Sequence, residues 1–127
     1  MLLNILIVVI GGGIGAASRY LVSSWAAERF GSNFPYGTLF VNVAGCFIIG
    51  LFLALVNDKI IVKPEWRLFV TTGFLGGLTT FSSFSYETIK LLQESDVSLA
   101  LYNVIANCGI GFLATWVGMN CARYLTL

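Results

Sequence analysis

Charged residues are scarce in this chain of 127 residues. Only 10% of its residues are charged and 57% are hydrophobic, and seven Lys and Arg residues against six Asp and Glu residues give a net charge of +1. Soluble domains carry about 25% charged residues. The composition therefore excludes a soluble enzyme, and the near-neutral balance excludes a protein that binds nucleic acid through a basic surface.

Residues that usually carry out chemistry are also missing. Histidine is absent, and the three cysteines, Cys46, Cys108 and Cys121, lie in apolar segments without a C-x-x-C spacing. This excludes a zinc site and a disulfide framework and favours small apolar packing residues. No Ser/His/Asp or Cys/His set, catalytic carboxylate pair or phosphate-binding loop occurs, so nothing predicts an enzyme.

What is present is a series of long uncharged segments. A membrane-spanning helix needs about 20 mostly apolar residues. The sequence therefore predicts an all-α membrane protein with one domain over residues 1–127. Its four expected transmembrane helices cover residues 3–25, 37–56, 66–92 and 99–124. Polar residues mark the loops, including Glu28 to Pro35 in the first and Gln93, Glu94, Ser95 and Asp96 in the third.

The basic residues give this chain only a weak preference for one orientation. With four spans, one side of the membrane carries Lys59, Lys63, Arg67 and Arg123, and the other carries Arg29 and Lys90, with Arg19 as a possible third. Orientation follows the basic bias. A bias this small permits insertion both ways and antiparallel pairing, and a single orientation stays open as the alternative.

Small residues recur at a spacing of four in the first and third helices. The pairs are Gly11/Gly15, Gly12/Ala16, Gly13/Ala17 and Gly73/Gly77. Such pairs predict close approach of helix backbones. The glycine run at residues 11–15 is not a dinucleotide-binding loop, because no strand precedes it and no acidic residue follows at the required distance.

The third helix combines a Gly76-Gly77 pair with seven hydroxyl residues between Thr71 and Ser85. Hydroxyls compete for backbone hydrogen bonds, and glycine weakens a helix interior. We therefore predict a break near Gly76–Thr80 and a restart toward Phe84, with an unbroken hydroxyl-rich helix as the alternative. Free N–H groups at the restart would favour an anion, and freed carbonyls would favour a cation.

Two aromatic residues follow the predicted break. Phe81 and Phe84, spaced i and i+3, share a helix face among hydroxyl residues. The rim of an aromatic ring is electropositive, so ring edges can contact a partly dehydrated anion. The simpler interpretation is that both rings pack in the core.

The fourth helix carries a narrow polar stripe. Asn103, Asn107, Gly111 and Thr115 follow at intervals of four, and the second helix offers Thr38 and Asn42 at the same interval. Amide and hydroxyl groups can replace water around a small anion. The alternative is hydrogen bonding between helices.

Arg19 and Glu87 are the charges closest to the membrane interior. Such residues are functional candidates by default. Arg19 would attract anions in a vestibule, or extend its charge to the membrane surface. Glu87 would pair with Arg19 or with hydroxyls, or serve as a proton-coupling site.

Three strings in the sequence resemble the CrcB/Fluc family of fluoride channels. They are Gly11-Gly12-Gly13-x-Gly15-Ala16-x-x-Arg19-Tyr20, Gly37-Thr38-Leu39-x-x-Asn42 and Thr72-Gly73-Phe74-x-Gly76-Gly77-Leu78-Thr79-Thr80-Phe81-Ser82-Ser83-Phe84-Ser85-x-Glu87. The resemblance covers most of the chain and is most specific in the third string.

The resemblance implies an antiparallel, dual-topology homodimer with two pores that exports fluoride passively across a bacterial inner membrane. It also implies pore roles for Phe81, Phe84 and Asn42, a vestibule role for Arg19 and the family's acidic position for Glu87. A structural sodium ion would be held by main-chain carbonyls at Gly76 and Thr79. On the fourth helix, Asn103, Asn107 and Gly111 match the family's polar track.

The sequence thus predicts a passive fluoride channel. Donors from Thr38, Asn42, Thr80, Ser83 and the fourth-helix asparagines Asn103 and Asn107 would replace water around the ion. The runner-up is a small proton-coupled four-helix exporter that uses Glu87, and a third class is an assembly protein whose helices only pack. An ion passes through a channel only if its binding is favourable yet weak. The lack of lysine near the expected pore residues fits that need.

Overall fold

The structure, a computed structural model, describes residues 1–94 and 96–125, so the predicted loop residue Ser95 lies outside the described residues. Within these ranges every regular element is a helix, which confirms the all-α class. Two segments, labelled η, are π-helical. In chain order the elements are α1 (Leu2–Phe30), α2 (Tyr36–Asp58), α3 (Pro64–Leu68), η1 (Phe69–Leu75), α4 (Gly76–Leu78), α5 (Phe81–Gln93), α6 (Val97–Ile105), η2 (Ala106–Ile110) and α7 (Gly111–Tyr124).

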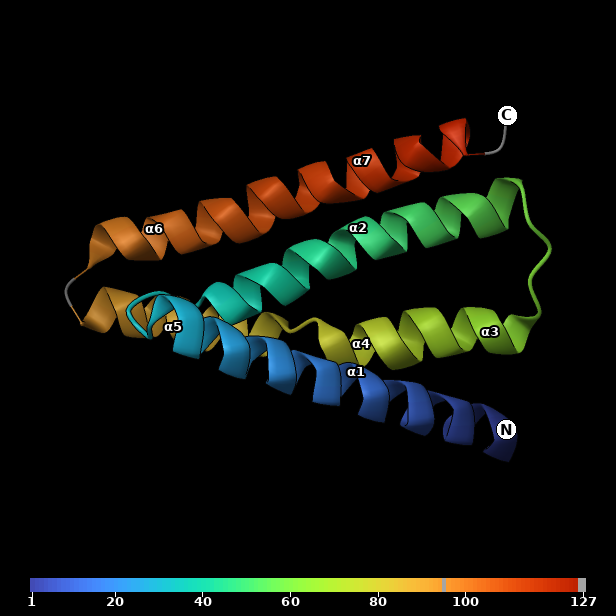
Figure 1. Cartoon of the computed structure of the whole chain (residues 1–127), viewed down its shortest axis with the longest axis horizontal. Helices are drawn as coiled ribbons and strands as arrows, with labels where there is room; N and C mark the ends of the chain where they lie inside the picture. Colours follow the sequence, from blue (N-terminus) through green and yellow to red (C-terminus); the bar gives the residue numbers. More distant parts are fainter. Residues whose placement is uncertain (95, 126–127) are drawn as a thin grey trace.

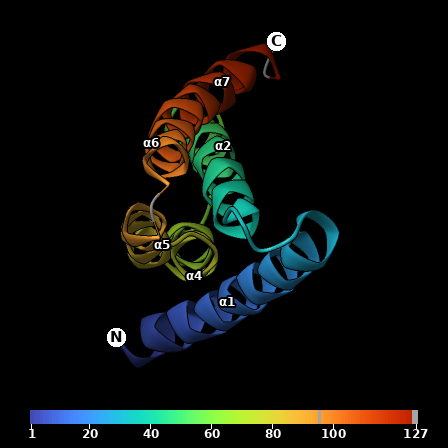
Figure 2. The same cartoon turned by 90° about the vertical axis from the view of Figure 1, so that its left-hand side faces the viewer.

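The chain runs along the molecule in alternating directions, through α1, then α2, then α3 to α5, then α6 to α7 (Figure 1). The N-terminus, the connection from α2 to α3 and the end of α7 lie at one end of the molecule, as predicted for four spans. Figure 2 shows α1 on one side and α7 on the other, with α4, α5 and α2 between them. The third span consists of α3, η1, α4 and α5. Because α2 packs mainly on α7 and α1 packs mainly on η1, this span lies between α1 on one side and the α2–α7 pair on the other.

Three stretches are long and apolar enough to cross a membrane: Leu2–Phe30, Tyr36–Asp58 and Val97–Tyr124. The expected span at residues 66–92 is divided among short elements, so no single helix there has that length. The predicted end of the first helix at Trp25 is wrong. The helix continues through Glu28 and Arg29 to Phe30, where Gly31 takes a positive φ of 83° and stops it.

Glycines bring α1 directly onto the third span, which confirms the predicted close packing. A Cβ at Gly11 would lie 2.8 Å from the Phe69 carbonyl oxygen, and Cβ atoms at Gly15 and Gly77 would overlap backbone atoms of Phe74 and Gly12. Gly13 is different, since a Cβ there meets nothing within 4 Å. The pair Gly13/Ala17 therefore does not join helices within the described protomer.

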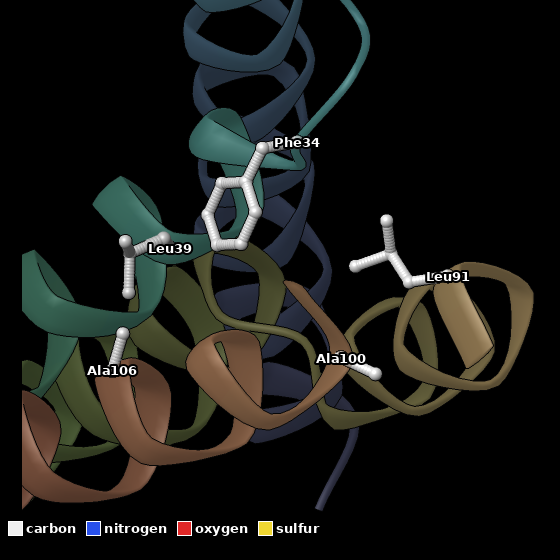
Figure 3. Close-up of a cluster of buried hydrophobic side chains, with 5 residues drawn as sticks. All are labelled: Phe34, Leu39, Leu91, Ala100 and Ala106. Carbon is white, nitrogen blue, oxygen red and sulfur yellow. The ribbon is translucent and has the colours of Figure 1, made fainter. Parts of the chain in front are cut away.

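A small apolar cluster closes the end of the molecule where the α1–α2 loop meets α5 and α6. Figure 3 shows its five buried side chains, which are Phe34, Leu39, Leu91, Ala100 and Ala106. Most large apolar residues of α1 and α7 are instead exposed on this protomer. A helix apolar on its outer faces is suited to contact with lipid or with another protein chain.

Candidate ion pathway

The helical path of the third span is interrupted at two threonines. Thr79 (φ −85°, ψ 156°) and Thr80 (φ −153°, ψ 117°) are both extended, and they form the non-helical link between α4 and α5 in Figure 1. Helix resumes at Phe81, three residues earlier than the expected restart near Phe84. Non-helical backbone at membrane depth needs partners from the protein or a cavity.

Asn42 on α2 supplies those partners. Its Oδ1 accepts from the Thr80 N–H at 2.9 Å, and its Nδ2 donates to the Thr80 carbonyl at 3.2 Å. The same Nδ2 donates to Asn107 Oδ1 at 3.0 Å. In a continuous helix the Thr80 N–H would bond to the Gly76 carbonyl, so Asn42 substitutes for backbone bonds that the break removes. Both Nδ2 hydrogens already have acceptors within the chain.

The restart of the helix is capped by its own side chains. Thr80 Oγ1 accepts from the Ser83 N–H at 3.1 Å and donates to Ser83 Oγ at 3.1 Å, with Ser82 Oγ at 3.3 Å. This is the usual role of an N-cap threonine. One of the N–H groups expected to be free for an anion is therefore bonded within the chain.

The predicted stripe on the fourth span is a chain of hydrogen bonds. Asn107 Nδ2 donates to both the carbonyl and Oδ1 of Asn103 at 2.9 Å. Asn103 is fully buried and donates through Nδ2 to Thr88 Oγ1 at 2.9 Å. The chain of hydrogen bonds does not continue from Asn107 to Thr115, because the Thr115 hydroxyl donates to the Gly111 carbonyl on its own helix. Hydrogen bonding between helices, the alternative interpretation of the stripe, accounts for the Asn42–Asn107 and Asn103–Thr88 contacts, whereas Asn107 bonds to Asn103 within the fourth span.

The two phenylalanines of α5 are in contact, as their spacing predicts. Their ring centroids are 5.7 Å apart with planes at 61°, an edge arrangement. Phe84 is buried, whereas Phe81 is 79% exposed on this protomer. Both line an open groove of about 450 Å³ together with Asn42, Thr80 and Asn107. Packing in the core therefore describes Phe84 but not Phe81.

Thr80 also lines a second cavity. It has a volume of about 320 Å³ and is lined by Arg19, Thr38, Thr80, Ser83 and Glu87, among others. Thr80 lines this cavity and the aromatic groove alike. The break thus borders both the groove that contains the aromatic pair and the cavity that contains Arg19.

Glu87 is held by a hydroxyl and not by a cation. Thr38 Oγ1 donates to Glu87 Oε1 at 2.8 Å, and Glu87 Oε2 is buried without a hydrogen-bond partner in the described part of the chain. Among the described residues no ion pair joins Arg19 to Glu87, so the expected pairing between them is wrong for this structure. The alternative, pairing with a hydroxyl, is confirmed.

Sequence reasoning missed Thr88, since a single threonine one residue after Glu87 carries no signal of its own. It also missed η1 and η2, because no residue pattern marks a π-helical turn. π-Helical turns frequently occur at functional sites. Here η2 carries Asn107, the residue that connects Asn42 to Asn103.

Comparison with known proteins identifies relatives along nearly the whole chain. The family model described as "CrcB-like protein, Camphor Resistance (CrcB)" matches residues 6–119. A Clostridium perfringens protein named "Fluoride-specific ion channel FluC" is 47% identical over 124 residues, covering 98% of this chain and 97% of that protein. Proteins of the same name from Acidobacterium capsulatum (88% of this chain, 90% of theirs) and Sulfurihydrogenibium sp. (94% and 97%) are each 45% identical.

Proposed function

Because the chain belongs to the CrcB family, we propose that it is a multi-pass membrane channel that conducts fluoride passively. Relatives of nearly the same length carry the name of a fluoride-specific ion channel. The relatives are named as ion channels, which indicates a channel and not an enzyme. Passive export of fluoride across a bacterial inner membrane is the physiological role that we infer.

The observation that carries the proposal is that Thr80 lines both the aromatic groove and the cavity that contains Arg19. Fluoride would leave water in the cavity lined by Arg19, pass Thr80 and Ser83, and reach the edges of Phe81 and Phe84. Arg19 supplies positive charge at one end, and no lysine lines either cavity. Weak, successive contacts of this kind allow an ion to enter and to leave.

The polar residues along this route have two different roles in our proposal. Thr38, Thr80 and Ser83 offer hydroxyls at the cavity that contains Arg19. Asn42 and Asn107 line the aromatic groove, but their amide hydrogens bond within the chain. The hydroxyl hydrogens of Thr38 and Thr80 are likewise donated within the chain, to Glu87 Oε1 and Ser83 Oγ. We therefore assign these two threonines and Asn42, Asn103 and Asn107 chiefly to holding the site in shape, and the direct contacts with fluoride to the Ser83 hydroxyl and the ring edges.

The working unit that we propose is an antiparallel homodimer with two pores. Phe81 is 79% exposed, and one wall of the aromatic groove is open in a single protomer. A second, inverted copy would close that groove and bury the ring. The weak basic bias between the two ends of the sequence permits both orientations.

A sodium ion at the centre of that dimer is part of the same proposal. The Thr80 N–H bonds to Asn42, which leaves the Gly76 carbonyl without its helical donor, and the extended Thr79 lies next to it in the break. Carbonyl oxygens are suitable ligands for a hard cation. Among the described residues no group of three carboxylate, thiol or imidazole side chains offers a competing site. When bound, the ion would balance the negative end of the preceding helix.

Fluoride efflux from liposomes that contain only this protein and lipid tests the function. We expect rapid efflux of fluoride and retention of chloride in matched vesicles, without a proton gradient. Efflux that stays unchanged in Phe81→Ile would contradict the assigned route. Efflux that requires a proton gradient would support the runner-up, a proton-coupled exporter, to which the buried oxygen of Glu87 lends its only support.

A further inference from the structure

A chain of hydrogen bonds leaves α5 and returns to it. It starts at Thr80, passes through Asn42 and Asn107 to Asn103, and ends at Thr88. Thr88 Oγ1 in turn donates to the Phe84 carbonyl at 2.7 Å. The segment of α5 that carries both aromatic rings is therefore held at both of its ends by one connected network.

We propose that Thr88 is a positioning residue of the ion path, which acts through Asn103, Asn107 and Asn42 to fix the break at Thr80. The inference rests on the proposed channel function. Thr88 lies outside the three sequence strings that resemble the family. Its side chain contacts the hydrogen-bond network and not the ion.

The polarity of the hydrogen bonds gives Thr88 this role. Its hydroxyl hydrogen is committed to the Phe84 carbonyl, so its oxygen acts as an acceptor for Asn103 Nδ2. That bond orients the Asn103 amide with Oδ1 toward Asn107. An asparagine side chain has one acceptor and one donor group, so fixing one end fixes the other.

The hydrogen bond from each amide orients the next one, first Asn107 and then Asn42. Asn107 turns its Nδ2 to Asn103 and its Oδ1 to Asn42, whose Nδ2 then faces Asn107 and the Thr80 carbonyl. Asn42 Oδ1 is left facing the Thr80 N–H. If the first amide turned over, Asn103 Nδ2 would face Asn107 Nδ2, which would keep only the Asn103 carbonyl as its acceptor on that helix and would weaken the support of Asn42.

Burial makes the first step of this chain sensitive. Asn103 has no exposed surface, so water cannot replace a lost acceptor there. A buried amide without its partner costs more than an exposed one, and partly satisfied networks rearrange. The rearrangement would reach Thr80, which lines both cavities of the ion path.

The test compares Thr88→Val, which has the same shape but no hydroxyl, with Thr88→Ser, which keeps the hydroxyl. We expect the fluoride efflux rate per active vesicle to fall at least about tenfold in Thr88→Val and to stay near wild type in Thr88→Ser. Thr115→Val is the matched control, because the Thr115 hydroxyl donates to the Gly111 carbonyl four residues earlier on its own helix and Thr115 lines neither cavity. The fraction of active vesicles reports folding, so loss of stability alone would lower that fraction and leave the rate unchanged.

A double-mutant cycle shows whether Thr88 acts through Asn103. In an Asn103→Ala background, Thr88→Val should have no further effect on the rate. A wild-type rate in Thr88→Val, a slow Thr88→Ser or fully additive effects with Asn103→Ala would each overturn the role. If Thr88→Val gives no folded protein, Thr88→Ala is judged by the same outcomes. Wild-type vesicles that retain fluoride would instead contradict the channel function itself.

Discussion

At the scale of single residues, the centre of the account is Asn42. It was expected to offer its amide to an ion, yet its Oδ1 and Nδ2 bond to the backbone on both sides of Thr80. Asn42 lines the aromatic groove, as a pore residue would, and its amide also supports the break. Support and conduction are linked, because Thr80 is the residue shared by the two cavities.

Asn42→Asp is expected to abolish most conduction. The aspartate keeps an acceptor for the Thr80 N–H but turns a carboxylate oxygen toward the Thr80 carbonyl and Asn107 Oδ1, both acceptors. A charge turned toward two acceptors at this half-buried position is expected to lower the efflux rate by about tenfold or more, since losing a hydrogen bond to such partners costs about 1–3 kcal/mol. The rate of fluoride efflux from liposomes measures the loss of conduction in this variant.

The control for that variant is Asn120→Asp. Asn120 donates to the Trp116 carbonyl near the end of α7, away from both cavities, so its efflux should match wild type. Wild-type efflux in Asn42→Asp would show that the Asn42 amide does not hold the break.

Glu87→Gln separates a channel from a proton-coupled exporter. A glutamine carbonyl accepts the Thr38 hydroxyl as Glu87 Oε1 does, so the contact survives without the charge. We expect fluoride efflux within about threefold of wild type, a difference below about 1 kcal/mol. The measurement is efflux with and without a pH gradient. Loss of transport in Glu87→Gln together with a requirement for the gradient would favour the exporter.

At the scale of elements, α1 packs closely on the third span and lines the cavity that contains Arg19. Gly15 lies against the backbone of Phe74, with no space for a side chain, whereas Gly13 faces open space on the same helix. This contrast gives two glycines, two residues apart, with opposite tolerance for a methyl group.

Gly15→Ala is therefore expected to destabilise the protein by about 2 kcal/mol or more, since overpacking forces backbone shifts. Gly13→Ala should leave stability unchanged or raise it slightly, because alanine favours a helix where space permits. Thermal unfolding in detergent measures both. Equal unfolding temperatures for Gly15→Ala and wild type would contradict the close packing of α1 on η1 and α4.

Element order, the glycine contacts and the contact of Phe81 with Phe84 follow from local patterns and were predictable. The helical restart at Phe81 was harder to locate, since it depends on Thr80 acting as its own cap and on Asn42, 38 residues earlier in the chain. The buried network was not predictable, because a spacing of four on one helix does not say which helix faces it. The Thr88 contact requires α6 to lie beside α5.

At the scale of the whole molecule, one protomer leaves its aromatic groove open and many apolar side chains exposed. An inverted second copy is the proposed partner. Light scattering in detergent should therefore give the mass of two chains of 13.8 kDa each. A monomer that still conducts fluoride would contradict the dimeric pore.

The orientation of the two copies is tested separately. A C-terminal tag should be accessible to an impermeant reagent from both faces of the cell membrane, in nearly equal amounts. Adding basic residues near Lys63 should bias insertion toward one orientation and lower activity, because orientation follows basic residues. Labelling from one face only would contradict dual topology.

The reversal potential of the current across a planar bilayer tests the central claim, passive and selective conduction of fluoride, most directly. With unequal fluoride and equal chloride on the two sides, the account predicts reversal at the Nernst potential of fluoride, unchanged by a pH gradient. A reversal potential that follows the chloride or the proton gradient would contradict it.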